Sequence, residues 1–182
     1  MPTYRKGKKR FFYIHIPRTA GRFIYENIIR NGFYPEQDPF KMMEGIEVAH
    51  FPASLYKKYL DVEGIPHIAV IRDPIERYFS LRNYPLIVSA ESWFMPQVDY
   101  LTKETNVWKL EDGFENNFSE WMSNIIQEDF KVDPLQEYAR HPKEIQHTID
   151  RTPELIDNIR RYYRRDIEQL YPELAAPFQE GT

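Results

Sequence analysis

The sequence predicts an α/β fold, a doubly wound parallel sheet flanked by helices in a single domain. Two apolar runs rich in β-branched and aromatic residues, 11–16 and 67–71, each pass directly into a loop and then into residues at helical spacing. Between them, 46–49 predicts a short strand and 53–60 a helix. This alternation of strands and helices is typical of parallel sheets, which bind their ligands at the carboxyl ends of the strands.

The first unit consists of the strand at 11–16, a tight turn and a helix at about 22–31. The turn begins at Pro17 and contains a single glycine. Such a turn directs backbone N–H groups and the positive end of a helix dipole at one point, which favours a phosphate or sulfate. Arg18 and Thr19 lie on the turn, where they can add charge-assisted and hydroxyl hydrogen bonds to an anion.

The second unit carries signals for a well-defined helix start. Asp73 suits the N-cap, Pro74 the first helical position and Glu76 the acid of a capping box. Arg72 is therefore expected at the carboxyl end of the preceding strand, and Ser80 about two turns into the helix.

Arg77, on the same predicted helix, allows two interpretations. It follows Asp73 by four residues, so the two side chains can form an intrahelical ion pair. It also precedes Ser80 by three residues, so it can contribute to an anion site. The sequence leaves both open.

The composition narrows the class of protein. A chain of 182 residues with 42% hydrophobic and 15% aromatic residues is long and apolar enough for one folded domain. The formal net charge of −4 argues against a nucleic-acid binder, so any anion site is expected to be local. The chain has no cysteine, which excludes disulfides and thiolate metal sites, and we expect no metal.

The first ten residues differ in composition from the rest of the chain. Residues 1–10 are basic and are expected to form a flexible arm, with the folded domain at 11–182. No run approaches the roughly 18 apolar residues of a membrane span, and 11–16 is too short for a signal peptide. We therefore expect a soluble, cytoplasmic protein, whose oligomeric state the sequence does not indicate.

Both loops resemble motifs of sulfotransferases that use PAPS (3′-phosphoadenosine 5′-phosphosulfate), in the carbohydrate, heparan/chondroitin-type branch. The loop Pro17-Arg-Thr-Ala-Gly-Arg-Phe23 resembles the 5′-phosphosulfate loop, which reads roughly P-K-T-A-G-T-S. The segment Arg72-Asp-Pro-Ile-Glu-Arg-Tyr-Phe-Ser80 resembles the R-D-P-x-x-R-x-x-S motif that holds the 3′-phosphate. Weaker resemblances lie at 96–101 (P-Q-x-x-Y-L), 109–112 and 163–171, so the likeness covers nearly the whole chain.

The resemblance implies a P-loop-like fold and a sulfuryl transfer from PAPS to a hydroxyl, with PAP as the second product and no metal. The branch favours a saccharide as the acceptor. Arg72 and Ser80 would hold the 3′-phosphate. The loop residues would hold the 5′-phosphosulfate: Arg18, Thr19, Ala20, Gly21, Arg22 and Phe23.

Two residues are expected to carry the chemistry. Arg18 stands where the family usually has lysine and would stabilise the leaving group. His50 follows a predicted strand, where this branch often places its catalytic histidine, and imidazole suits a general base at neutral pH. The Arg18 turn, His50 and Arg72 should then meet at one edge of the sheet, in one site.

Departures from the motif leave other functions open. Arg22 and Phe23 replace the small hydroxyl residues that usually follow the glycine, which puts donor affinity in question. A catalytically degenerate nucleotide-binding or interaction protein on the same scaffold is therefore the main alternative. A kinase is a third, disfavoured because the loop lacks the G-x-x-x-x-G-K-[ST] pattern.

The remaining candidates have ordinary structural explanations. His15 and His67 fall in predicted strands and are expected in the core or at its edge, although His15 is close enough to the loop to line the site. His141 and His147 receive no role. Four aromatic residues can either stack on sugar rings or pack the core: Trp93, Phe94, Tyr100 and Trp108. Thr152-Pro153 predicts the start of a last helix. The arginines between 160 and 165 on this helix can attract an anionic glycan or simply form its solvated face.

Overall fold

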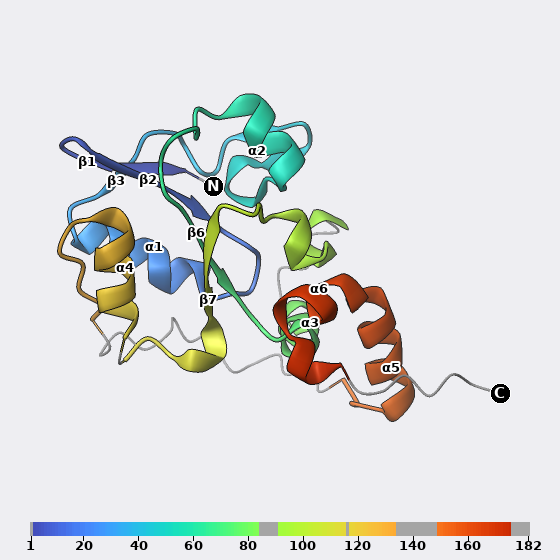
Figure 1. The fold of residues 1–182 in the computed structure, drawn as a ribbon. Coiled ribbons are helices and arrows are strands. Elements are labelled where there is room, and N and C mark those ends of the chain that lie inside the picture. Colours follow the sequence, from blue (N-terminus) through green and yellow to red (C-terminus); the bar gives the residue numbers. More distant parts are fainter. Residues whose placement is uncertain (1, 84–90, 116, 134–148, 176–182) are drawn as a thin grey trace.

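The computed structural model describes residues 2–83, 91–115, 117–133 and 149–175, and centres on a five-stranded sheet (Figure 1). The strand order is β3-β1-β2-β6-β7. Strands β2, β6 and β7 run parallel to one another. At one edge, β1 pairs antiparallel with β2, and β3 pairs antiparallel with β1. The bounds are β1 (Thr3–Lys6), β2 (Lys9–Ile14), β3 (Tyr34–Pro35), β6 (His67–Ile71) and β7 (Thr105–Lys109).

The α/β class is confirmed, but the prediction of a purely parallel sheet is wrong. The run predicted as a strand at 46–49 does not join the sheet. Its first half is β5 (Ile46–Glu47), which pairs only with β4 (Met42–Met43) in a separate small hairpin. Glu44 and Gly45 both have positive φ (52° and 74°), so the chain reverses tightly and pairs locally. The parallel part of the sheet therefore has only three strands.

The prediction of a flexible arm at residues 1–10 is also wrong. β1 pairs along its length with β2, and Gly7, at φ 58°, allows the tight turn between them. Tyr4 is 1% exposed and its ring stacks on Phe11 at 5.5 Å between centroids. The basic composition of this stretch predicted a solvated arm. Thr3 and Tyr4 are nevertheless buried, because the free energy gained by burying them outweighs the preference of the neighbouring cations for water.

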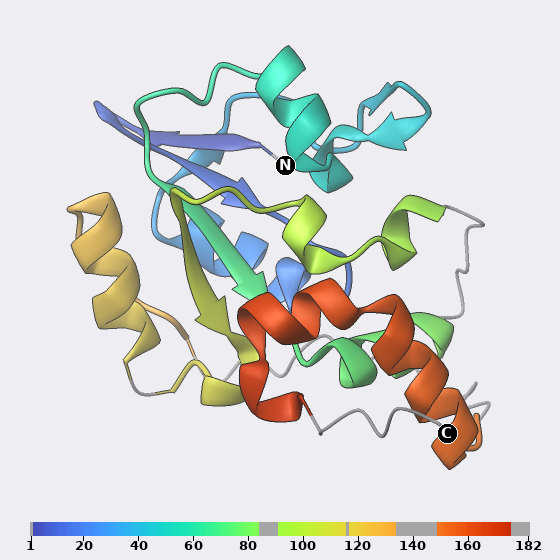
Figure 2. The ribbon, with the colours of Figure 1, turned by 45° about the vertical axis from the view of Figure 1, so that its right-hand side comes forward.

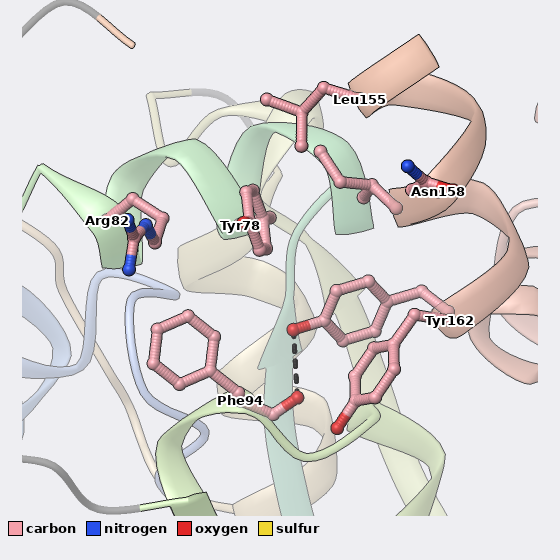
Figure 3. A pocket seen from close by; sticks show the side chains of 8 residues that line it. Tyr78, Arg82, Phe94, Leu155, Asn158 and Tyr162 are labelled. Atoms are coloured by element: carbon pink, nitrogen blue, oxygen red, sulfur yellow. Dashed lines mark hydrogen bonds between the residues drawn. The ribbon is translucent and has the colours of Figure 1, made fainter.

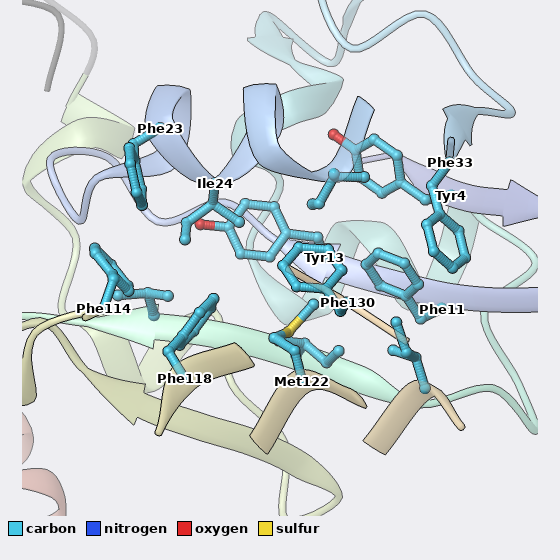
Figure 4. Close-up of a cluster of buried hydrophobic side chains, with 14 residues drawn as sticks. Tyr4, Phe11, Tyr13, Phe23, Ile24, Phe33, Phe114, Phe118, Met122 and Phe130 are labelled. Atoms are coloured by element: carbon cyan, nitrogen blue, oxygen red, sulfur yellow. The ribbon is translucent and has the colours of Figure 1, made fainter. Parts of the chain in front are cut away.

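Helices lie on both faces of the sheet, as expected from alternating side chains on β2. Phe11 and Tyr13 face a core formed with α1 and α4, which Figure 4 shows in close-up. Phe12 and Ile14 face the opposite core, formed with α2 and α6. The six helices of the described chain are α1 (Gly21–Arg30), α2 (Ala53–Tyr59), α3 (Pro74–Arg82), α4 (Phe118–Ile126), α5 (Pro153–Tyr162) and α6 (Arg164–Leu170).

The N-caps read from the sequence are confirmed, but the capping box is wrong, because the Asp73 N–H donates to the Glu111 carboxylate (2.7 Å) and Glu76 pairs with Arg151. The Asp73 carboxylate accepts hydrogen bonds from the backbone N–H groups of Ile75 (2.7 Å) and Glu76 (3.1 Å). The Thr152 hydroxyl caps α5 in the same way. The last predicted helix is divided at Tyr163 into α5 and α6, and α5 packs along α3 (Figure 2).

Short 3-10 helices complete the connections. They are Val48–His50, Glu91–Phe94, Gln97–Asp99, Leu110–Asp112 and Pro172–Leu174. In the part of the chain that the structure describes, no helix combines the length and the apolar character needed to cross a bilayer.

Candidate functional site

A cavity of about 660 Å³ lies where β2 and β6 end, the edge at which open α/β sheets bind ligands. Eight of the nine predicted site residues line it: Arg18, Ala20, Gly21, Arg22, Phe23, His50, Arg72 and Ser80. The other wall residues include His15, Glu26, Phe40, Glu47 and Trp93. The fold therefore places two motifs that lie far apart in the sequence in the wall of one cavity.

The turn between β2 and α1 is tight and includes two residues in a left-handed backbone conformation. Arg18 and Ala20 both have positive φ (69° and 64°), a conformation that costs free energy in residues with a Cβ. Helix α1 begins immediately afterwards at Gly21, and no side chain caps its first N–H groups. These donors and the positive end of the helix dipole therefore remain suited to an anion in the cavity.

A hydrogen bond joins the two predicted anion loops directly. Nε of Arg18 donates to Oγ of Ser80 at 2.9 Å, across 62 residues of chain. Arg72 lines the same cavity, so the loop after β2 and the helix after β6 present their polar groups to one volume. This contact is the geometric link between the two motifs.

Arg72 is held by a residue whose role the sequence did not reveal. The Gln97 amide oxygen accepts from the backbone N–H of Arg72 (2.9 Å), and its amide nitrogen donates to the Arg72 carbonyl (2.7 Å). Gln97 is fully buried. It belongs to the P-Q-x-x-Y-L segment, so the motif was visible in the sequence, but the partner of the glutamine was not.

The same segment is anchored from α6. The Asp166 carboxylate accepts from the backbone N–H groups of Gln97 (2.9 Å) and Val98 (3.0 Å). Burial raises the pKa of Asp166 above its usual value, and these hydrogen bonds act in the opposite direction. The C-terminal pattern beginning at Tyr163 thus supports the site from behind.

Thr19 is the one predicted site residue that does not line the cavity. It is fully buried, and its hydroxyl donates to the Ile16 carbonyl at 2.9 Å. The side chain closes the turn rather than facing an anion, contrary to our expectation. Such a local bond from a side chain to the backbone stabilises a turn.

Arg77 fits neither interpretation offered by the sequence. Its side chain is fully buried and donates to three carbonyls, those of Pro17 (3.0 Å), Met95 (3.0 Å) and Trp93 (2.7 Å). The guanidinium therefore ties the turn after β2 to the segment that carries Trp93. We call these three hydrogen bonds the Arg77 bracket. They hold the two segments together and take the place of an ion pair with the N-cap residue Asp73.

His15 takes the second of the two positions that the sequence left open for it. It lies just past the end of β2 and lines the cavity. Its ring presses on the start of α1, because a Cβ at Gly21 would lie 1.7 Å from its Nε2. Gly21 is therefore required for space. The sequence signal for this position was that His15 stands only two residues before Pro17, next to the turn.

His50 is buried at 6% exposure and packs between two rings. Its ring centroid lies 4.7 Å from that of His15 and 5.1 Å from that of Trp93. Nδ1 lies 3.3 Å from the His15 carbonyl, which can only accept, so we assign the proton to Nδ1. Nε2 then carries the lone pair, and the Glu47 carboxylate is 3.5 Å away.

Burial keeps both imidazoles of the site neutral near pH 7. It lowers the pKa of His50 to about 4, while the hydrogen bond to the His15 carbonyl acts in the opposite direction. Burial also lowers the pKa of His15 well below the usual histidine value. A neutral His50 can accept a proton, which is the state that a general base requires.

The other candidate residues lie elsewhere. His67 contacts the Val62 carbonyl at 2.8 Å, as expected of a core histidine. Trp108 packs against Phe118 and Trp121, and Tyr100 is fully buried. His141 and His147 lie outside the described residues.

The arginine cluster of α5 and α6 is engaged with its own neighbours. Arg160 and Arg161 contact Asp157 and Asn158, and Arg165 pairs with Asp99 at 2.8 Å. This arrangement favours the solvated-face interpretation of these residues.

A second, smaller cavity of about 380 Å³ lies between α3 and α5 (Figure 3). Tyr78 and Arg82 of α3 form one side, and Leu155, Asn158 and Tyr162 of α5 the other. The Tyr163 hydroxyl donates to the Phe94 carbonyl at its base, at 2.8 Å. Phe94 thus faces this cavity, and none of the predicted site residues does.

No set of three histidine or acidic side chains in the described ranges is placed to hold a metal ion. Comparisons with protein-family models, curated proteins and solved structures find no match. The geometry of the cavity is therefore the basis on which we infer a function.

Proposed function

We propose that this chain is a PAPS-dependent sulfotransferase with a P-loop-like fold that transfers a sulfuryl group to a hydroxyl, with a saccharide as the favoured acceptor. The observation that carries the proposal is the Arg18–Ser80 hydrogen bond. It joins the turn suited to a 5′-phosphosulfate with the helix suited to a 3′-phosphate, in a cavity that also contains His50.

The donor fits the residues that are present. Uncapped N–H groups at the start of α1, together with Arg18 and Arg22, suit the 5′ end of PAPS. Arg72 and Ser80 suit its 3′-phosphate. Phe23 has no hydroxyl to offer; its ring stacks on Phe114 at 5.0 Å between centroids and anchors α1 in the core.

The proposed step uses His50 and Arg18. Nε2 of His50 takes the proton of the acceptor hydroxyl while that oxygen bonds to sulfur and the bond from sulfur to the bridging phosphate oxygen breaks. Arg18 stabilises the charge that develops on that bridging oxygen. Glu47 stabilises the imidazolium, because its carboxylate lies 3.5 Å from Nε2.

Nucleotide titration by calorimetry tests the proposal. We expect PAP and PAPS to bind without Mg²⁺, and ATP to bind no better when Mg²⁺ is added. Arg72→Ala should weaken PAP binding, whereas Arg82→Ala, which alters the other cavity, should not. Mg²⁺-dependent ATP binding would favour a kinase, and no binding of any nucleotide would favour an interaction protein.

Turnover separates an enzyme from a nucleotide-binding protein. His50→Ala should reduce sulfuryl transfer by roughly 10²–10⁴-fold with PAP affinity unchanged. A near-normal rate in this variant would remove His50 as the base. PAP binding with no transfer in the natural protein would favour the degenerate alternative.

A further inference from the structure

Arg72 lies in the gap between a strand and a helix. Strand β6 ends at Ile71, which pairs with Lys109 of β7, and α3 begins at Pro74. The N–H and C=O of Arg72 and the N–H of Asp73 therefore lie past the last pair of the ladder and before the first turn of the helix. Backbone groups at such a position need partners from side chains or water.

Side chains from two other segments supply partners for all three groups. The Gln97 amide bonds both backbone groups of Arg72, at 2.9 Å and 2.7 Å. The Glu111 carboxylate accepts from the Asp73 N–H at 2.7 Å. The peptide units before and after the Arg72 Cα are thus both held from outside. Because peptide units are planar, holding both of them restrains φ and ψ of Arg72 directly.

Both contacts are anchored by the segment that contains α6. Asp166 of α6 accepts from the backbone N–H of Gln97 at 2.9 Å. Tyr171, directly after α6, donates its hydroxyl to the second oxygen of Glu111 at 3.0 Å. Burial raises the pKa of Tyr171, so the hydroxyl keeps the proton that it donates. The α6 segment therefore reaches the backbone around Arg72 along two routes that share no residue.

The Glu111 contact suits ligand binding better than it suits stability. Glu111 is exposed, and a hydrogen bond there adds little to the free energy of unfolding, because water competes for both partners. A carboxylate close to a phosphate site also repels the phosphate. Any benefit of Glu111 to phosphate binding therefore comes from the backbone geometry that it fixes.

We propose that Glu111 is a positioning residue for the nucleotide. Together with Gln97 it orders the backbone of Arg72 before the nucleotide binds, so that the guanidinium is ready for the 3′-phosphate. The conformational entropy of ordering this long side chain is then lost during folding and does not reduce the affinity. The inference rests on the proposed function, because it concerns the donor end of that same site.

The test measures the affinities for PAP and for 5′-AMP, which lacks the 3′-phosphate, by calorimetry. Glu111→Ala should weaken PAP binding about three- to tenfold, the effect of ordering one long side chain only on binding. The affinity for 5′-AMP should not change, because 5′-AMP offers Arg72 no 3′-phosphate. Loss of the carboxylate charge alone would act in the opposite direction and tighten PAP binding.

Three further variants separate positioning from charge and from general stability. Glu111→Gln should retain the PAP affinity, since its amide can still accept from the Asp73 N–H and contact the Tyr171 hydroxyl. Tyr171→Phe should weaken PAP binding in the same direction as Glu111→Ala, because it removes the hydroxyl that holds the carboxylate. Asp112→Ala is the matched control and should change neither affinity, since Asp112 is the next residue of the same 3-10 helix and is likewise exposed.

Four outcomes overturn the inference. They are an unchanged PAP affinity in Glu111→Ala, equal weakening of PAP and 5′-AMP, an equal loss in Glu111→Gln, and an equal loss in Asp112→Ala. Each of them leaves the proposed function intact as long as the natural protein binds PAP. Failure of the natural protein to bind PAP would instead overturn the proposed function, and this inference with it.

Discussion

The His15 side chain determines which residue can occupy position 21. The imidazole occupies the place of a Cβ at position 21, and it is itself held between the rings of Tyr13 and His50. The ring therefore has little room to move away. A glycine that appeared to serve the turn alone thus also serves the packing of a histidine against the helix start.

We expect Gly21→Ala to cost about 1–3 kcal/mol of unfolding free energy, the usual cost of overpacking, and to weaken PAP binding. Urea denaturation and calorimetry measure the two effects. His15→Ala should remove the obstacle, so the cost of Gly21→Ala should largely disappear in the double variant. Simple additivity of the two substitutions would show that the ring contact is not the cause.

His50 should make stability depend on pH. Its pKa is near 6.5 in the unfolded chain and about 4 in the folded one, so the unfolded state binds more protons between these values. Neutral His50 therefore contributes about 3 kcal/mol to the free energy of unfolding. This contribution is complete above pH 6.5 and is lost as the pH falls to about 4. Urea denaturation from pH 4 to 7 measures it.

His50→Asn is the appropriate comparison, because the amide can still donate to the His15 carbonyl. This variant should show a shallower dependence of unfolding free energy on pH over that range. An unchanged slope would show that His50 is not protonated on unfolding as proposed.

At the scale of elements, Arg77 joins three parts that are separate in the sequence. Helix α3 supplies the side chain, the turn after β2 supplies the Pro17 carbonyl, and the segment before η3 (Gln97–Asp99) supplies the carbonyls of Trp93 and Met95. Because Trp93 packs on His50, the bracket also supports the position of the proposed base.

Arg77→Met should destabilise the protein by about 3 kcal/mol or more, because it leaves three buried carbonyls without their donor. Arg77→Lys should be intermediate, since an ammonium cannot reproduce the planar fork of a guanidinium. Chemical denaturation followed by tryptophan fluorescence measures both variants. The control is Arg82→Met on the exposed end of the same helix; equal losses at both positions would contradict the bracket.

At the scale of the whole molecule, the sheet brings together the two predicted anion loops, which are 62 residues apart at their hydrogen-bonded side chains. A ligand that contacts both loops should stabilise the entire fold. At one hundred times its dissociation constant, PAP should add about 2.7 kcal/mol. For a domain of this size that corresponds to a rise in Tm of roughly 5–10 °C.

The comparison ligand is 5′-AMP, which lacks the 3′-phosphate. At equal concentration it should raise Tm by clearly less than PAP, because Arg72 and Ser80 then have no phosphate to contact. Differential scanning calorimetry measures both shifts. Equal shifts would show that only one of the two loops contacts the nucleotide.

Local signals in the sequence determined much of this structure. The strand at His67–Ile71, the capped start of α3 and the capped start of α5 all lie where the sequence predicted them, because they depend on residues close together in the chain. The turn after Pro17 was identified for the same reason. These features need no knowledge of distant partners.

Tertiary structure alone decided how these pieces are used. Whether residues 46–49 join the sheet, whether 3–6 form a strand, and where Arg77, Thr19 and His15 point all depend on partners far along the chain. A side chain with several possible partners takes those that folding brings within reach, and buried polar groups must then be satisfied. The local pattern therefore predicted the two loops, and the packing of the sheet decided that they share one cavity.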